Sequence, residues 1–229
     1  MTKKILITGA NGQLGHEMRN ALKGNNRFEC IFTDVAELDI CNAEAVKQTI
    51  ADNHIDYIVN CAAYTQVDKA EDNAELCKKI NTDAVENLAR AAADYGARMI
   101  HISTDYVFNG RGYRPYTEDV VPDPQSVYGS TKLEGEKILT DICPESIIIR
   151  TAWLYSPYGN NFVKTMLHLG EEREELSVVA DQIGTPTCAA DLAQAILVIL
   201  QADTFVPGTY HFSDEGACSW YDFTVTIHR

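Results

Sequence analysis

A turn with three glycines stands where the first apolar run of the chain gives way to its first helical pattern. Residues 5–8 predict a buried strand, and apolar side chains at helical spacing predict a helix over residues 13–22. The turn between them, residues 9–15, has the spacing G-x-x-G-x-x-G. Such glycines permit a tight turn, let a pyrophosphate approach the backbone and let the helix pack on the strand. A turn without a ligand is the alternative, but the strand–turn–helix context favours a nucleotide.

The same alternation of strand and helix continues to about residue 150. Further strands are predicted at residues 29–33, 57–60, 99–103 and 147–150, and further helices at residues 43–52, 74–95 and 127–142. Gly96 ends the longest of these helices. Strands that alternate with helices form right-handed crossovers and a parallel sheet covered on both faces. We therefore predict an α/β fold, a Rossmann-type doubly wound parallel sheet.

The rhythm changes after Arg150, where aromatic residues, glycine and proline become denser. Short strands are expected at residues 176–180 and 209–212, a helix at residues 191–201, and a last helix from about Ser219. We predict a dinucleotide-binding Rossmann domain over residues 1–150 and a smaller substrate-binding lobe over residues 151–229. This lobe is expected to be incomplete at its C-terminus.

Composition narrows the classes of partner. The formal net charge of −14 argues against nucleic acid, whose phosphates attract clustered Lys and Arg. The seven cysteines show no C-x-x-C spacing, so buried reduced thiols are expected rather than a zinc site or disulfides. The first strand leaves no room for a signal peptide, and the longest apolar stretch is too short for a bilayer. A cytoplasmic protein without a membrane partner is expected.

An acidic residue follows the glycine turn at the sequence spacing typical of a ribose-binding carboxylate. Asp34 ends the second predicted strand, 19 residues after Gly15. A carboxylate about 20 residues beyond the turn accepts a ribose 2′-hydroxyl, which by itself favours NAD over NADP. A loop carboxylate that faces water is the alternative. Asp39 and Ile40 are weaker candidates for the adenine side.

A tyrosine and a lysine share one helix face. Tyr128 and Lys132 are separated by one turn of the predicted helix. An ammonium beside the phenol lowers its pKa and makes it a general acid or base at an alcohol or carbonyl oxygen. Thr104 ends the fourth predicted strand, at the sheet edge that holds the ligand crevice, and is predicted to donate a second hydrogen bond to the reacting oxygen. Chance spacing and a structural strand-end threonine are the alternatives. Asn81 is a candidate to support Lys132 through water.

These motifs together resemble the extended short-chain dehydrogenase/reductase family, in particular its nucleotide-sugar reductases. The resemblance covers essentially the whole chain. Its most specific segments lie at residues 59–71, 103–108, 128–136 and 181–187. The family's pattern usually continues well beyond the last residue of this sequence.

The resemblance implies a set of site residues and partners. The cofactor, NADPH or NADH, is expected against residues of the glycine turn (Gly9, Asn11, Gly12, Gln13, Leu14 and Gly15), against Asp34, Asp39 and Ile40, against a nicotinamide-side wall of Ala62, Ala63 and Tyr64, and against Tyr128 and Lys132. Catalysis is expected from Thr104, Tyr128 and Lys132, and substrate contacts from Thr104, Asp105, Tyr106 and Trp153. A nucleotide-sugar substrate is implied, and a homodimer is compatible with the resemblance. Some members depend on magnesium, but the sequence locates no metal site.

Two other functions stay open at this stage. The same subfamily contains the non-catalytic regulatory subunit of methionine adenosyltransferase, which can keep the tyrosine and lysine. The scaffold also serves nucleotide-sugar epimerases and dehydratases. In the dehydratases, the strand-end threonine is followed by Asp and Glu, whereas here Asp105 and Tyr106 follow Thr104. A phenol is a poor base at neutral pH, so a reductase is favoured over a dehydratase.

Overall fold

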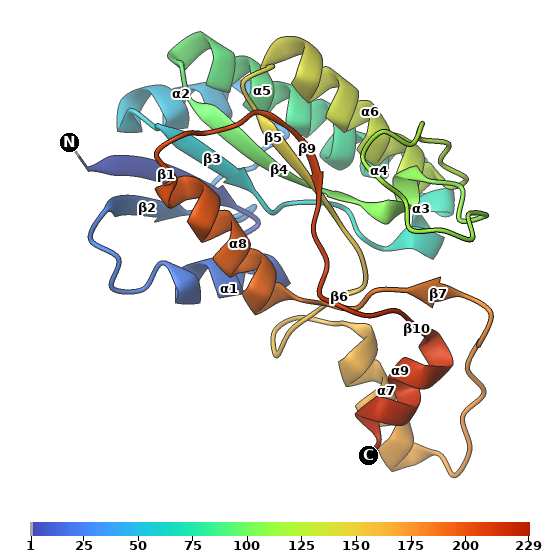
Figure 1. Ribbon diagram of the computed structural model, residues 1–229. Helices are drawn as coiled ribbons and strands as arrows, with labels where there is room; N and C mark the ends of the chain where they lie inside the picture. Colours follow the sequence, from blue (N-terminus) through green and yellow to red (C-terminus); the bar gives the residue numbers. More distant parts are fainter. Residues whose placement is uncertain (1) are drawn as a thin grey trace.

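The computed structural model describes residues 2–229 and is built around one six-stranded parallel sheet (Figure 1). The strand order is β2-β1-β3-β4-β5-β9, and each neighbouring pair is parallel. The strands are β1 (Lys3–Thr8), β2 (Phe28–Phe32), β3 (Tyr57–Asn60), β4 (Arg98–Thr104), β5 (Ile147–Thr151) and β9 (Gly208–His211). This confirms the predicted doubly wound α/β fold.

Helices cover both faces of the sheet, as Figure 1 shows. One face carries α2 (Ala43–Asn53), α5 (Ala84–Tyr95) and α6 (Val127–Ile142), and the other carries α1 (Gln13–Ala21) and α8 (Ala189–Gln201). Two apolar clusters fill these layers, and fully buried Leu6 and Ile5, neighbours on β1, belong to opposite ones. Alternate residues of a strand point to opposite faces, so an apolar run of this kind is suited to a sheet covered on both sides.

The strand order reverses beside β1. The chain passes from β1 outward to β2, then crosses back so that β3 lies on the other side of β1. Ligands of open α/β sheets bind outside the carboxyl ends of the strands at such a switch point. The segments after β1 and β3, which include the glycine turn and the predicted nicotinamide-side wall, meet there.

The later part of the chain contributes to two regions. Helix α8 and strand β9 return to the main sheet, with β9 along β5. The helices α7 (Phe162–Glu172) and α9 (Trp220–Ile227) lie apart from the sheet (Figure 1). Two small strand pairs accompany them: β7 (Ile183–Gly184) with β10 (Cys218–Ser219), and β6 (Leu154–Tyr155) with β8 (Thr187–Cys188). The division at residue 150 stays a prediction, and the lobe after it shares strand β9 with the sheet.

Local structure differs from the prediction at several places. The helix expected over residues 74–95 is divided into α4 (Ala74–Lys78), a π-helical turn η1 (Lys79–Asp83) and α5. Residues 176–180 form no strand, so that prediction was wrong; the Val179 carbonyl oxygen accepts the N–H of Tyr221 at 3.0 Å instead of joining a strand ladder. The helices α3 (Val67–Asp72) and α7 and the 3₁₀ turn η2 (Asp105–Val107) were not predicted.

Candidate active site

The glycine turn leaves no room for side chains at two of its three glycines. Gly9 has a φ of 64°, and a Cβ there would lie 2.6 Å from the backbone nitrogen of Ala62. A Cβ on Gly15 would lie 2.3 Å from the Gly9 carbonyl oxygen. Gly12 has a φ of −77°, and its Cβ would meet only that same oxygen, at 3.2 Å. Because Gly12 is the N-cap of α1 and has no side chain, the first N–H groups of the helix are left for an external anion.

The predicted acid of β2 lies against this turn. Asp34 Oδ2 accepts the backbone N–H of Asn11 at 2.9 Å. The structure therefore brings together the end of β2 and the glycine turn, as a ribose-binding acid requires. Asp39 is exposed and accepts the backbone N–H two residues further on at 2.9 Å, whereas Ile40 is buried in the core between the sheet and α2. Because the Ile40 side chain is buried, only the backbone of this residue is suited to contact adenine.

The wall after β3 is fixed by two asparagines. Asn60 Oδ1 accepts the backbone N–H of Ala62 at 3.2 Å. Asn81 in the π-helical turn accepts the N–H of Tyr64 at 2.9 Å and donates to its carbonyl oxygen at 3.1 Å. Asn81 thus holds the wall at Tyr64, and its support of Lys132 through water stays a prediction. Ala63 lies half-buried between these two anchors.

Tyr128 lies in the first turn of α6, whose N-terminus is capped by Ser126. Burial raises the pKa of Tyr128, and a hydrogen bond with the Thr104 side chain opposes that rise. The expected lowering of this pKa is therefore wrong for the structure as it stands, because removal of water from the phenol outweighs the other effects. A phenol that keeps its proton at neutral pH is suited to donate it to a substrate oxygen.

The residues after Thr104 stay close to the phenol. The Thr104 hydroxyl donates to Asp105 Oδ1 at 3.1 Å and accepts the N–H of Tyr106 at 3.2 Å. Burial raises the pKa of Asp105 to about 6. The half-exposed ring of Tyr106 meets the ring of Tyr128 edge-on, with 5.4 Å between centroids. These contacts leave the Tyr106 ring available to line a substrate site.

Lys132 is almost completely buried. Its Nζ donates to the Ile102 carbonyl oxygen at 2.6 Å and lies 3.2 Å from His101 Nε2. Burial lowers the pKa of Lys132 to about 8, and Glu136 acts in the opposite direction. Burial therefore brings the pKa of this amine towards the range in which general acids and bases are useful.

A buried ion pair supports the same helix and strands. Arg150 of β5 donates to both carboxylate oxygens of Glu136 on α6, with Nη2 to Oε2 at 2.6 Å. Ser103, next to Thr104, donates to the same carboxylate. Together with Ser103, the pair links α6, β5 and β4 next to Thr104 and one helical turn from Lys132.

Trp153, the predicted substrate contact after β5, belongs to an aromatic cluster. Its φ is 48°, a left-handed conformation that a large residue adopts only when its surroundings enforce it. Its indole stacks on Trp220 with 3.4 Å between centroids, and a Cβ on Gly184 would lie 2.3 Å from the ring. Gly184 and Trp220 therefore set the position of Trp153, and sequence reasoning identified neither of them as such.

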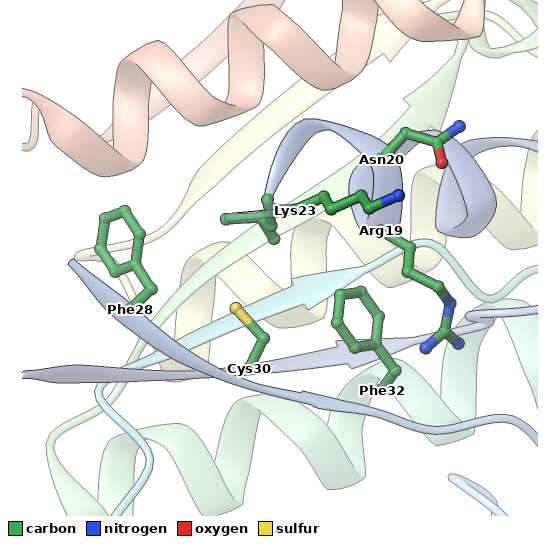
Figure 2. Close-up of a pocket in the computed structure, with 7 residues that line it drawn as sticks. Arg19, Asn20, Lys23, Phe28, Cys30 and Phe32 are labelled. Carbon is green, nitrogen blue, oxygen red and sulfur yellow. The ribbon is translucent and has the colours of Figure 1, made fainter. Parts of the chain in front are cut away.

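A shallow groove lies elsewhere, between α1 and the edge strand β2. Figure 2 shows the Arg19 guanidinium over the Phe32 ring, 4.2 Å from its centroid. The groove is lined by Arg19, Asn20, Leu22, Lys23, Phe28, Cys30 and Phe32. None of these is a predicted site residue, and the groove is separate from the catalytic cluster.

Three further features concern the nature of the site. All seven cysteines, which fall within residues 2–229, are free thiols. Within those residues, no three or more His, Cys, Asp or Glu side chains are grouped so as to hold a metal ion. No helix in the described part of the chain has the length and apolar character needed to cross a membrane. The magnesium dependence allowed by the resemblance is left without a site.

The glycine turn at the switch point, with a tyrosine and lysine on α6 facing a threonine at the end of β4, defines an extended short-chain dehydrogenase/reductase. Within that class, the chain belongs to the family described as "RmlD substrate binding domain", whose pattern matches residues 3–229.

Similar proteins include several dTDP-4-dehydrorhamnose reductases. A dTDP-4-dehydrorhamnose reductase of Escherichia coli (strain K12) is 46% identical over 231 residues, which span 97% of this chain and 76% of that protein. The structure of a dTDP-4-dehydrorhamnose reductase from Clostridium acetobutylicum is 51% identical, with a TM-score of 0.95 over 99% of this chain and 79% of that one. The Bacillus anthracis dTDP-4-dehydrorhamnose reductase in complex with NADP is 44% identical, also with a TM-score of 0.95, over 99% and 80% of the two chains.

Sequence reasoning missed the buried polar groups beneath the predicted catalytic residues. These are Glu136 on α6 and three strand residues, Asn60, His101 and Arg150. The sequence signal for the last three was a polar residue in an apolar strand, which by itself does not identify a partner. Gln13 was predicted to contact the cofactor; its side-chain oxygen also accepts from Asn161 at 2.9 Å and so ties α1 to the segment before α7.

Proposed function

We propose that this chain reduces the 4-keto group of dTDP-4-dehydro-6-deoxy-L-mannose to give dTDP-L-rhamnose, with NADPH or NADH as reductant. The observation that carries the proposal is the burial of Tyr128 in hydrogen-bond contact with Thr104, at the carboxyl end of β4. The relatives named dTDP-4-dehydrorhamnose reductase, similar over nearly the whole chain, support this substrate.

The residues around the glycine turn fit a dinucleotide. The open N–H groups after Gly12 would bind its diphosphate, Asp34 a ribose hydroxyl, and Ala62 to Tyr64 the nicotinamide side. NADP in the Bacillus anthracis structure supports NADPH as well as NADH, although Asp34 by itself favours NADH. When bound, the reduced nicotinamide supplies a hydride to the ketone carbon.

The chain supplies the proton and the hydrogen bonds. Tyr128 donates its phenolic proton to the ketone oxygen as negative charge develops there. The Thr104 hydroxyl turns from Asp105 and donates a second hydrogen bond to the same oxygen. One hydride and one proton convert the ketone to an alcohol, and Lys132 stabilises the phenolate that remains. Asp105, Tyr106 and Trp153 are proposed to orient the sugar, since they lie at or beyond the strand ends that carry these groups.

The test is turnover with and without the phenolic hydroxyl. Wild-type protein is mixed with dTDP-4-dehydro-6-deoxy-L-mannose, and the oxidation of NADPH or NADH is followed. Tyr128→Phe should lower kcat by about 10²-fold or more while NADPH binding persists, because a positioned acid is lost and the ring volume is kept. Tyr95→Phe, at the exposed end of α5, is the matched control and should keep full turnover.

Two outcomes would contradict the proposal. Near-normal turnover of Tyr128→Phe would assign the proton to another donor. Tight NADPH binding by wild-type protein without any oxidation would favour a regulatory subunit instead.

A further inference from the structure

A row of hydrogen-bonded, buried side chains crosses the neighbouring strands β1, β3 and β4 and reaches Lys132 on α6. Thr8 and Asn60 are hydrogen-bonded at 2.7 Å, and Asn60 Nδ2 lies 3.0 Å from His101 Nδ1. His101 Nε2 in turn lies 3.2 Å from Lys132 Nζ. All four side chains are essentially inaccessible to water. Each polar atom must therefore find its hydrogen-bond partner among these side chains or in the backbone beside them.

The orientation of the Asn60 amide follows from a backbone donor. The N–H of Ala62 points at Asn60 Oδ1 at 3.2 Å, and a backbone N–H only donates. Oδ1 is therefore the oxygen, and the atom that faces His101 is the amide nitrogen. Because an amide nitrogen only donates, His101 Nδ1 must accept and carries no proton.

The proton of a neutral His101 is thereby placed on Nε2. Burial lowers the pKa of His101 well below its ordinary value, so the ring is neutral. A neutral imidazole without a proton on Nδ1 carries it on Nε2. The group that faces Lys132 is thus an N–H donor.

An ammonium is a poor partner for that donor. A protonated lysine has three donors and no acceptor, whereas an unprotonated amine has a lone pair for Nε2–H and can still donate to the Ile102 oxygen. The ionisable groups around Lys132 are His101 on β4, Cys77 on α4, and Glu136 and Tyr128 on its own helix. Glu136 favours the ammonium but is itself engaged by Arg150.

We propose that His101, held by Asn60 with its proton on Nε2, is a positioning residue that binds the unprotonated amine of Lys132 and disfavours the ammonium at this position. Protonation of Lys132 breaks the contact with His101 and frees Nζ for Tyr128 and the cofactor ribose. The role of the freed ammonium rests on the proposed function. The state of the two side chains does not, and it can be measured without substrate.

The first experiment determines the tautomer of His101 by ¹⁵N-detected imidazole spectra of the wild-type protein. His101→Gln identifies the signals. We expect a neutral ring with the proton on Nε2 from about pH 6 to about pH 9, a range that includes the pH at which an ordinary histidine changes its charge. A ring protonated on Nδ1 would overturn the proposal. Because this measurement uses wild-type protein, it does not depend on whether a variant folds.

The second experiment titrates Lys132 through its ¹³Cε shift, identified by its loss in Lys132→Arg. In His101→Gln the side-chain oxygen can accept from the ammonium, and the pKa of Lys132 should rise by about one unit or more, a tenfold gain in proton affinity. In His101→Met, whose side chain is of similar length but has neither an N–H donor nor an oxygen acceptor, the pKa of Lys132 should rise less. His168→Gln, in an exposed pair on α7, is the control and should leave the titration unchanged. An unchanged Lys132 pKa in His101→Gln would refute the positioning role.

The pH profile of turnover then connects this state to catalysis. If the ammonium is the active form, the alkaline limb of kcat/KM should move upward in His101→Gln by as much as the Lys132 pKa. An alkaline limb that stays fixed while the Lys132 pKa rises would refute the link to catalysis. Absence of turnover in wild-type protein would refute the proposed function alone, because the two spectroscopic results would stand.

Discussion

The buried pair of Glu136 and Arg150 offers a sharp test of how the catalytic helix is held. Their side chains are 5% and 8% exposed, and Arg150 donates through both Nε and Nη2 to the carboxylate. Glu136→Gln keeps the shape but removes the negative charge, which leaves the guanidinium buried and unpaired. Loss of one partner of a buried pair costs about 3–5 kcal/mol.

That free energy can be converted to a melting temperature. For a chain of this length, each kcal/mol lowers the Tm by about 2–4 °C, so Glu136→Gln should lower it by about 6–20 °C. The matched control is Glu86→Gln, which breaks the exposed pair with Arg90 on α5 and should cost less than about 1 kcal/mol. Calorimetry or circular dichroism measures both variants side by side.

A double variant separates burial from attraction. Glu136→Leu with Arg150→Met replaces both charges by apolar groups, and most of the lost stability should return because neither charge stays buried alone. If Glu136→Gln lowers the Tm no more than Glu86→Gln does, the pair is not a structural requirement and the reasoning is refuted.

Three further predictions concern the site itself. Gly12→Val should weaken NADPH binding at least about tenfold in calorimetry with little change in Tm, since only one close contact faces its Cβ. Gly15→Ala should instead lower the Tm, because its Cβ would meet backbone atoms. Equal loss of binding at equal Tm in both variants would contradict this distinction. The pKa of Asp105 is raised to about 6, so loss of its proton opposes folding. The stability of the wild-type protein should therefore fall as the pH rises from about 4 to about 6. Urea titrations at each pH should show a smaller fall for Asp105→Asn. A pH dependence that is the same in both proteins would exclude Asp105 as its source. With dTDP-glucose and NAD, mass spectrometry should find no product lighter by one water, and such a product would overturn the reductase assignment in favour of a dehydratase.

Local signals determined much of this protein. The glycine turn, the strands of the first half, helix α6 and the Tyr128–Lys132 spacing were predicted from the sequence because each depends on residues close together in the chain. Turn geometry needs glycine at particular positions, and periodicity reports which face of a strand or helix is buried. The resemblance to reductases depended on the same local motifs.

Only the tertiary structure decided which distant groups meet. Folding placed β9 beside β5 and brought His101 Nε2 on β4 into contact with Lys132 Nζ on α6. The same order paired Arg150 with Glu136, and burial then raised the pKa of Tyr128, where its lysine neighbour alone predicted a fall. Sequence spacing carries no information on the water that folding removes or on the partners that replace it. For buried polar groups, those two quantities determine charge and position.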